Sequence, residues 1–122
     1  MSVFYVTIGL GDSKGERFEE QKALVDTGAT WTWVPADVLA RLGHEPTRKR
    51  RLKTADNRII ERDATEVPIR IGDETLSNLC IFGDEGSQLL LGAVTLEAFS
   101  LSPDPVNEQL VPVVGLLMSL VD

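Results

Sequence analysis

The sequence contains very little of the chemistry from which thiol and metal sites are built. Among its 122 residues there is one cysteine, Cys80, and one histidine, His44. A single cysteine forms neither an internal disulfide nor a cysteine metal cluster, and a lone histidine offers zinc no second ligand at a usual spacing. We therefore expect no metal site. Cys80 is expected to be a small buried hydrophobic residue in an apolar strand, and His44 a surface residue.

Long apolar runs are also absent. The most apolar segment, residues 111–121, is 11 residues long and contains Pro112 and Gly115, so it is too short to cross the hydrocarbon core of a bilayer. The first residues lack the basic start and apolar core of a signal peptide. These features predict no membrane span and, together with the single cysteine, a location in the reducing cytoplasm.

Basic residues are outnumbered by acidic ones. The chain has 12 Lys and Arg against 19 Asp and Glu, a formal net charge of -7, which argues against binding to the phosphate backbone of a nucleic acid. The basic run from Arg48 to Arg51 is the exception, and we interpret it as the solvated face of a strand. A nucleic-acid site there would instead predict salt-sensitive retention of RNA or DNA. Length and composition favour a single globular domain, residues 1–122.

Turn-forming residues divide the chain into short segments rich in β-branched and aromatic residues. Strands are predicted at residues 3–10, 17–24, 31–34 and 75–82, the first two as a hairpin. Two longer strands between residues 47 and 71 are expected to fold back at Ala55, Asp56 and Asn57, because Asp and Asn tolerate left-handed turn conformations. The sequence therefore predicts a second hairpin that projects from the domain.

Proline and glycine mark the expected helices and a break in the tail. Pro35 suits the first turn of a short helix that ends before Gly43, and a second short helix is expected at residues 93–99. A break is expected at residues 102–105, followed by a strand at 110–114. Pro112 makes this an edge strand, whose partner we expect in another chain.

The sequence Leu-Val-Asp-Thr-Gly-Ala-Thr at residues 24–30 carries the most specific chemistry. Hydrolysis of an amide needs a base that takes a proton from water and an acid that protonates the carbonyl, and two adjacent carboxyls sharing one proton supply both. Asp26 follows an apolar strand, the Thr27 hydroxyl can lock the turn, and Gly28 lets a substrate approach the backbone. The alternative is a structural aspartate in a tight turn. Asp56 is not assigned to catalysis, because turn chemistry explains it.

This segment resembles the active-site loop of the retroviral aspartic protease family and its single-domain cellular and bacterial relatives. The hairpin tip at residues 55–57 corresponds to the flap that covers the substrate in that family. Leu-Leu-Leu-Gly at residues 89–92, followed by the helix at 93–99, resembles the family's second signature. It also echoes the chain itself, because residues 24–29 and 90–93 both lead from two apolar residues through Gly-Ala to a short helix.

The resemblance implies an all-β, retropepsin-like closed barrel with a flap hairpin and one or two short helices. It also implies a homodimer, because one Asp-Thr-Gly triplet supplies half of a site. The implied activity is that of an aspartic endopeptidase in which paired Asp26 carboxyls activate water, without a metal or organic cofactor. A catalytically silent dimerisation or peptide-binding module is the alternative.

The resemblance also suggests which residues contact the substrate, and it has two departures. Thr27, Gly28 and Ala29 would form the active-site loop, and residues 55–57, Ala55, Asp56 and Asn57, would bind a protein or peptide substrate from the flap. Retroviral members usually carry an ion pair where Thr30 and Ala93 stand, so a dimer of this chain must be held differently. The flap has no glycine between Gly43 and Gly72. Trp31 and Trp33 are expected either to fill the core or to line substrate subsites, and a core or interface position is favoured for at least one of them.

Overall fold

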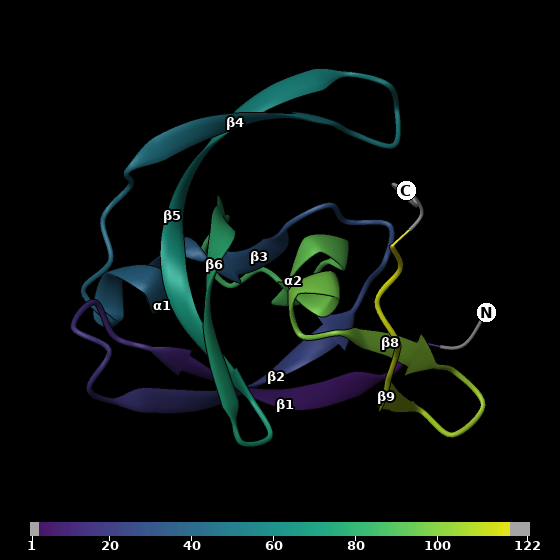
Figure 1. Cartoon of the computed structure of the whole chain (residues 1–122). Helices are drawn as coiled ribbons and strands as arrows, with labels where there is room; N and C mark the ends of the chain where they lie inside the picture. The colour runs from purple at the N-terminus through teal and green to yellow at the C-terminus, as the bar shows by residue number, and fades with distance from the viewer. Residues whose placement is uncertain (1–2, 118–122) are drawn as a thin grey trace, which may run out of the picture.

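The computed structural model describes residues 3–117 and consists mainly of strands arranged around a ring (Figure 1). Seven strands form one sheet. The fifth strand along the chain also pairs with the first strand, and this pairing closes six of the seven strands into a barrel. In spatial order they are β1 (Tyr5–Gly11), β2 (Phe18–Val25), β7 (Leu90–Leu91), β3 (Thr32–Pro35), β6 (Glu74–Gly83), β5 (Ile59–Ile71) and β4 (Arg48–Lys53). Two short helices, α1 (Ala36–Arg41) and α2 (Ala93–Ala98), complete this part of the chain. The predicted all-β closed barrel with short helices is confirmed.

The core lies inside this ring. Most of its fully buried members are branched aliphatic side chains on alternate positions of the strands, as expected for strands with one face toward the interior, and Leu39 comes from α1. The largest are Ile8, Leu10, Leu39, Ile69, Ile81, Leu91, Val34 and Val67. Burying each such side chain contributes roughly 1.5–3 kcal/mol, so the barrel is a rigid base for the loops that it carries.

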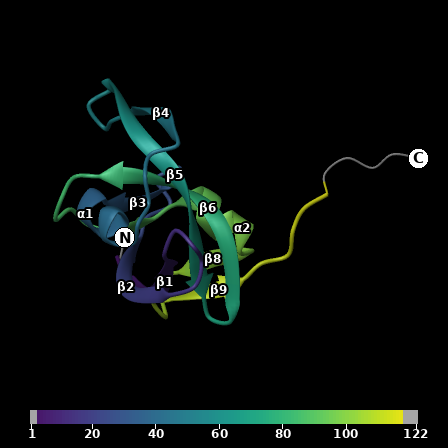
Figure 2. The same cartoon turned by 90° about the vertical axis from the view of Figure 1, so that its left-hand side faces the viewer.

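Each predicted hairpin is present. β1 and β2 pair antiparallel from Tyr5 with Leu24 to Gly11 with Phe18. β4 pairs only with the first half of β5, whereas the second half of β5 pairs with β6, so the β4–β5 hairpin extends beyond the barrel (Figure 2). Its turn contains Asn57 at φ 71°, a left-handed conformation that asparagine tolerates. We call residues 48–64 the flap.

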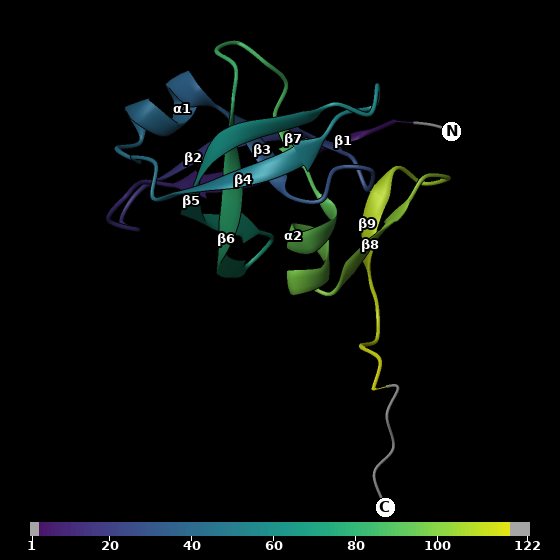
Figure 3. The same cartoon turned by 90° about the horizontal axis from the view of Figure 1, so that it is seen from above.

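The tail differs from the prediction. Residues 101–104 form β8 (Leu101–Asp104), so the break expected at residues 102–105 is wrong, and the turn follows it. β8 pairs with β9 (Gln109–Pro112) in a separate two-stranded sheet of the same chain, beside α2 (Figure 3). The partner of β9 is therefore not in another chain. Pro103 and Pro112 are tolerated because both strands of a two-stranded sheet are edge strands.

His44 was expected at the surface, and this prediction is wrong. Its side chain is only 8% exposed, and its Nε2 lies 2.7 Å from the carbonyl oxygen of Gly11. The chain reverses at Gly43, which has φ 83°, and this brings His44 back against β1. Cys80 is buried as predicted, and burial raises the pKa of its thiol to about 12. Within the described residues no helix is long and apolar enough to span a membrane.

Candidate active site

Asp26 follows directly from the end of β2. This end of the strand is held by parallel pairing with β7, in which Leu24 faces Leu90 and Val25 faces Leu91. The backbone N–H of Asp26 donates to the carbonyl of Leu91 at 3.0 Å. The candidate catalytic carboxyl therefore stands on the barrel wall, half-buried, at the point where two apolar strands end side by side.

The loop that follows is closed by Asp26 itself. The backbone N–H of Gly28 donates to Asp26 Oδ1 at 2.9 Å, and the N–H of Ala29 donates to the Asp26 carbonyl at 3.2 Å. The Thr27 hydroxyl is exposed and makes no hydrogen bond within residues 3–117, so the expected lock by Thr27 is absent. Because one carboxylate oxygen is engaged, the side chain of Asp26 has a defined orientation.

Helix α2 clamps the loop from the other side. The N–H groups of Ala93 and Val94, in the first turn of α2, donate to the carbonyls of Ala29 and Thr30 at 2.8 and 2.9 Å. The first N–H groups of a helix have no acceptor within the helix, so they need acceptors from outside it. Thr30 and Ala93 are the positions at which retroviral relatives carry an ion pair, and here backbone hydrogen bonds connect the same two segments.

Two buried threonines support this clamp. The hydroxyl oxygens of Thr32 and Thr95 are 2.7 Å apart, and the N–H of Gly92 donates to Thr32 Oγ1 at 3.0 Å. Both threonines are almost fully buried. Sequence reasoning did not single them out, although each is a polar residue inside an apolar segment of the repeated strand-to-helix unit. Buried hydroxyls of this kind require partners, so their presence was a usable signal.

The space between the loop and the flap is a groove of about 390 Å³. Asp26, Gly28 and Ala29 line it from the barrel, and the flap contributes strand residues rather than its tip. The remaining lining residues are Thr30, Trp31, Trp33, Arg51, Leu52, Lys53, Thr54, Ile60 and Leu90. The structure therefore brings the predicted loop residues into one groove beneath the flap.

The flap-tip residues Ala55, Asp56 and Asn57 are exposed and are not among the residues that line the groove. The carboxyl of Asp56 accepts hydrogen bonds from the Thr54 hydroxyl and from Arg58 Nε, the latter at 2.8 Å. These bonds, with that of Thr54 the larger contribution, hold the pKa of Asp56 below its usual value. Its role in the turn is the one that the sequence predicts, and a substrate contact by the tip stays a prediction.

Two tryptophans form the wall of the groove between loop and flap. Trp31 and Trp33 are half-buried, and neither belongs to the core. The guanidinium carbon of Arg50 lies 5.7 Å from the ring centroid of Trp31, and that of Arg62 lies 5.8 Å from the ring centroid of Trp33. The sequence favoured a core or interface position for at least one of them, but neither lies in the core and both line the groove beside Asp26. A contact with substrate stays a prediction.

Comparison with known proteins agrees with this architecture. Residues 17–98, more than half of the chain, match the family model of the gag-polyprotein putative aspartyl protease, and the chain belongs to this family. The match includes both the Asp26 loop and Gly92. No curated protein matches.

Among solved structures, the chain is similar to the protease of simian foamy virus (mac), determined in solution. The two share 16% sequence identity with a TM-score of 0.56, over 81% of this chain and 98% of the viral one. At this identity the likeness concerns the fold, and it confirms the retropepsin-like barrel.

Proposed function

We propose that this protein is an aspartic endopeptidase that acts as a homodimer. The observation that carries the proposal is the position of Asp26, which is held in a hydrogen-bonded loop on the barrel wall and lines a groove beneath a hairpin flap. One chain supplies one such carboxyl, and peptide hydrolysis by this chemistry needs two. A second copy therefore supplies the other half of the site.

In the proposed reaction the two Asp26 carboxyls share one proton and hold a water between them. The ionised carboxylate takes a proton from the water as the water oxygen attacks the peptide carbonyl carbon. The protonated carboxyl donates its proton to the carbonyl oxygen. The carboxyl that took the water proton then gives it to the amide nitrogen as the carbon–nitrogen bond of the tetrahedral intermediate breaks. The other carboxylate takes back a hydroxyl proton of the intermediate, which leaves a carboxylic acid and an amine and restores the shared proton. Every step uses side chains of the protein, so no metal or organic cofactor takes part.

The remaining roles follow from the extended shape of a peptide in such a groove. Backbone groups of Gly28 and Ala29 lie beside Asp26 and are proposed to bind the substrate main chain, with Thr27 completing the loop. The tip residues Ala55, Asp56 and Asn57 are proposed to close over the peptide from above. A cytoplasmic location also remains a proposal.

The described tail supports the proposed dimer. Residues 113–117 extend away from the barrel and contain Val114, Leu116 and Leu117, which are 91%, 84% and 80% exposed (Figure 3). Clustered apolar side chains in water are a sign of a contact surface. A second copy of the chain is the partner that an incomplete active site requires.

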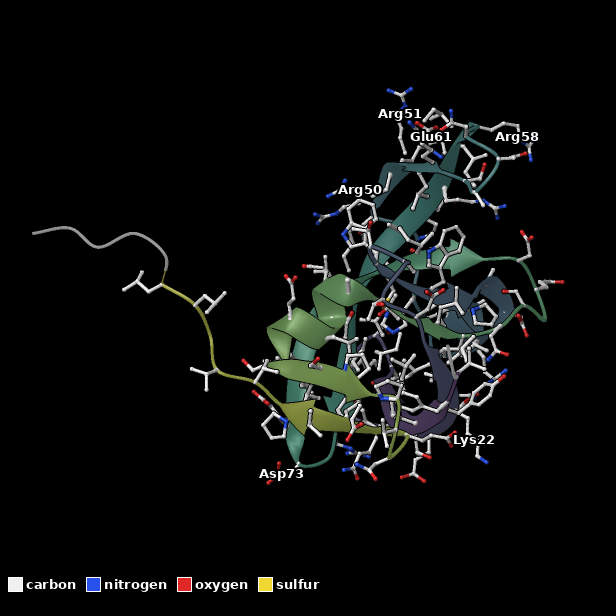
Figure 4. The ribbon with its side chains drawn as sticks, turned by 90° about the vertical axis from the view of Figure 1, so that its right-hand side faces the viewer. Lys22, Arg50, Arg51, Arg58, Glu61 and Asp73 are labelled. Carbon is white, nitrogen blue, oxygen red and sulfur yellow. The ribbon has the colours of Figure 1, made fainter. Side chains whose placement is uncertain are left out.

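The test compares three full-length proteins on an unfolded polypeptide from acidic to neutral pH. We expect wild-type protein to cleave it and Asp26→Asn to lose activity by roughly a thousandfold or more. Asp73→Asn is the matched control, because Asp73 is exposed in the β5–β6 turn at the opposite end from the flap (Figure 4). Equal cleavage by wild type and Asp26→Asn would exclude the aspartic mechanism. A dimer in which all three proteins are inert would instead favour the catalytically silent module.

A further inference from the structure

The flap has a charge opposite to that of the rest of the chain. Residues 48–64 carry seven of the 12 basic residues but only three of the 19 acidic ones, a net charge of +4. The remainder, with five basic and 16 acidic residues, carries -11. A basic hairpin above a groove in an acidic protein produces a local field that attracts anions to the groove.

The two faces of the flap use this charge differently. Along β4, Arg48, Lys49, Arg51 and Lys53 are exposed, whereas Arg50 and Leu52 are half-buried. Strand alternation therefore directs the side chains of Arg50 and Leu52 toward the barrel, whereas Arg51, on the other face, is exposed and borders the groove. Figure 4 shows the side chain of Arg51 at the outer end of the flap and that of Arg50 lower, beside the body of the protein.

Arg50 has a direct neighbour of the same charge. In the β4–β5 register it stands opposite Arg62, which also lies on the inner face and is half-buried. Like charges at directly opposed positions destabilise a hairpin unless anions compensate them. Each guanidinium lies over a tryptophan, Arg50 over Trp31 and Arg62 over Trp33.

Only one of the two arginines has a carboxylate partner. Arg62 Nη1 lies 2.7 Å from Asp84 Oδ1. Arg50 donates from Nη1 to the carbonyl of Lys49 at 3.0 Å and pairs with no carboxylate anywhere in residues 3–117. A guanidinium has five N–H donors, so most of the hydrogen-bonding capacity of Arg50 is available to a ligand.

We infer that Arg50 is a specificity residue that binds the carboxylate of an acidic side chain in the peptide substrate. This rests on the proposed function, which puts an extended peptide in the groove. The ring of Trp31 fixes the plane of the guanidinium, and a planar guanidinium with free N–H edges matches a carboxylate in a bidentate geometry. Arg50 is not itself a lining residue of the groove, but its guanidinium lies over Trp31. Because Trp31 and Asp26 line that groove, the acidic residue lies close to the peptide bond that is cleaved. The substrate class is peptides with Glu or Asp beside the cleaved bond.

The test measures binding separately from cleavage. Fluorescent decapeptides are titrated with full-length Asp26→Asn protein, which cannot cleave them. Each peptide has an otherwise apolar sequence with a single Glu, Gln or Lys, and the set places that residue at each central position in turn. At one position or more we expect the Glu peptide to bind about tenfold more tightly than the Gln peptide, with the ratio falling as salt is added. The readout is fluorescence anisotropy.

Matched double variants locate the effect. Adding Arg50→Met to Asp26→Asn should bring the Glu to Gln ratio close to one, and adding Arg50→Glu should reverse the preference toward the Lys peptide. Arg48→Met removes a charge of the same kind from the exposed start of the same strand, outside the residues that line the groove, so it should leave the ratio unchanged. Circular dichroism and thermal unfolding of each variant verify that the flap variants are folded.

The outcomes separate this inference from the proposed function. A ratio within twofold of one at every position, or equal loss of the ratio in the Arg50→Met and Arg48→Met variants, overturns the inference even if the wild type cleaves peptides. A preference that depends on Arg50 upholds the inference even if no peptide is cleaved, and only the proteolytic activity then fails. Displacement of the Glu peptide by single-stranded RNA at equal charge concentration would assign the inner face to nucleic acid and overturn the inference.

Discussion

At Gly92 the backbone of the second strand-to-helix unit packs tightly against the backbone of the first. A Cβ atom there would lie 2.4 Å from the carbonyl oxygen of Trp31 and 2.9 Å from that of Ala29. These are backbone atoms of the loop that follows Asp26, so they have no freedom to move aside without moving the loop. The absence of a side chain at Gly92 is therefore what allows α2 to hold the active-site loop.

We predict that Gly92→Ala destabilises the protein by about 1–3 kcal/mol, because overpacking forces the backbone apart. Urea unfolding followed by circular dichroism measures the change. Gly9→Ala is the control, since its new Cβ would meet the flexible side chain of Arg70 at an ordinary 3.4 Å. A Gly92→Ala protein as stable as the Gly9→Ala protein would show that the loop is not held by this close approach.

At the scale of elements, the first helix is attached to the barrel by an ion pair. Arg41, at the end of α1, donates from Nη2 and Nε to the two carboxylate oxygens of Glu19 on β2, at 2.5 and 3.2 Å. Gln21 donates to the same carboxylate. The hydrogen bond from Arg41 is the main cause that lowers the pKa of Glu19 from 4.5. The pair therefore stabilises the attachment of α1 in a pH-dependent way.

The sign of this dependence follows from the lowered pKa. The folded state favours the ionised Glu19, so its contribution to stability is complete above a pH of about 4.5 and is lost as pH falls through the folded pKa. We predict that Glu19→Gln lowers the melting temperature at pH 7 and that the difference from wild type shrinks as the pH falls below 4.5. The measurement is calorimetry across this range. Glu20→Gln, on the neighbouring exposed position, should show no comparable loss, and a pH-independent effect of Glu19→Gln would contradict the ion pair.

At the scale of the whole molecule, the chain is asymmetric. One face carries the groove with its single Asp26, and the tail leaves Val114, Leu116 and Leu117 in solvent. Both features are unfavourable or incomplete in a monomer. The proposed dimer with closed two-fold symmetry would satisfy both, because the same surfaces would meet their counterparts in a second copy.

If the active unit is a dimer, an inactive chain should abolish the activity of the active chain with which it pairs. In an equal mixture of wild type and Asp26→Asn, equilibrated by dilution and reconcentration, about a quarter of the dimers contain two wild-type chains. We predict that the mixture has about a quarter of the activity of wild type at the same total protein concentration. Specific activity of the wild type alone should also fall on dilution. Asp73→Asn mixed in the same way should cause no loss. If activity is proportional to the concentration of wild-type chains at every dilution, whether or not Asp26→Asn is present, the complete site lies within one chain.

Much of the fold follows from local sequence. Alternation of β-branched and aromatic residues indicated the strands at β1, β2 and β6, and turn chemistry indicated the flap reversal at Asn57. The apolar run before Asp26 predicted a carboxyl at the end of a strand. These features depend on residues within a few positions of one another, where backbone preferences act directly. The misplaced break at Pro103 shows the limit, because a proline is excluded only from strands whose N–H is needed.

What the sequence determined by itself is the Asp26 loop, the order of strands along the chain and the presence of a flap. The tertiary structure alone decided which distant residues meet. Thr32 and Thr95 are 63 positions apart, β7 pairs with β2, and Arg50 lies over Trp31 but finds no carboxylate in the described chain. Contacts of this kind are selected by closure of the whole barrel rather than by any local pattern, so Asp26 was readable from the sequence, whereas the clamp that orients its loop was not.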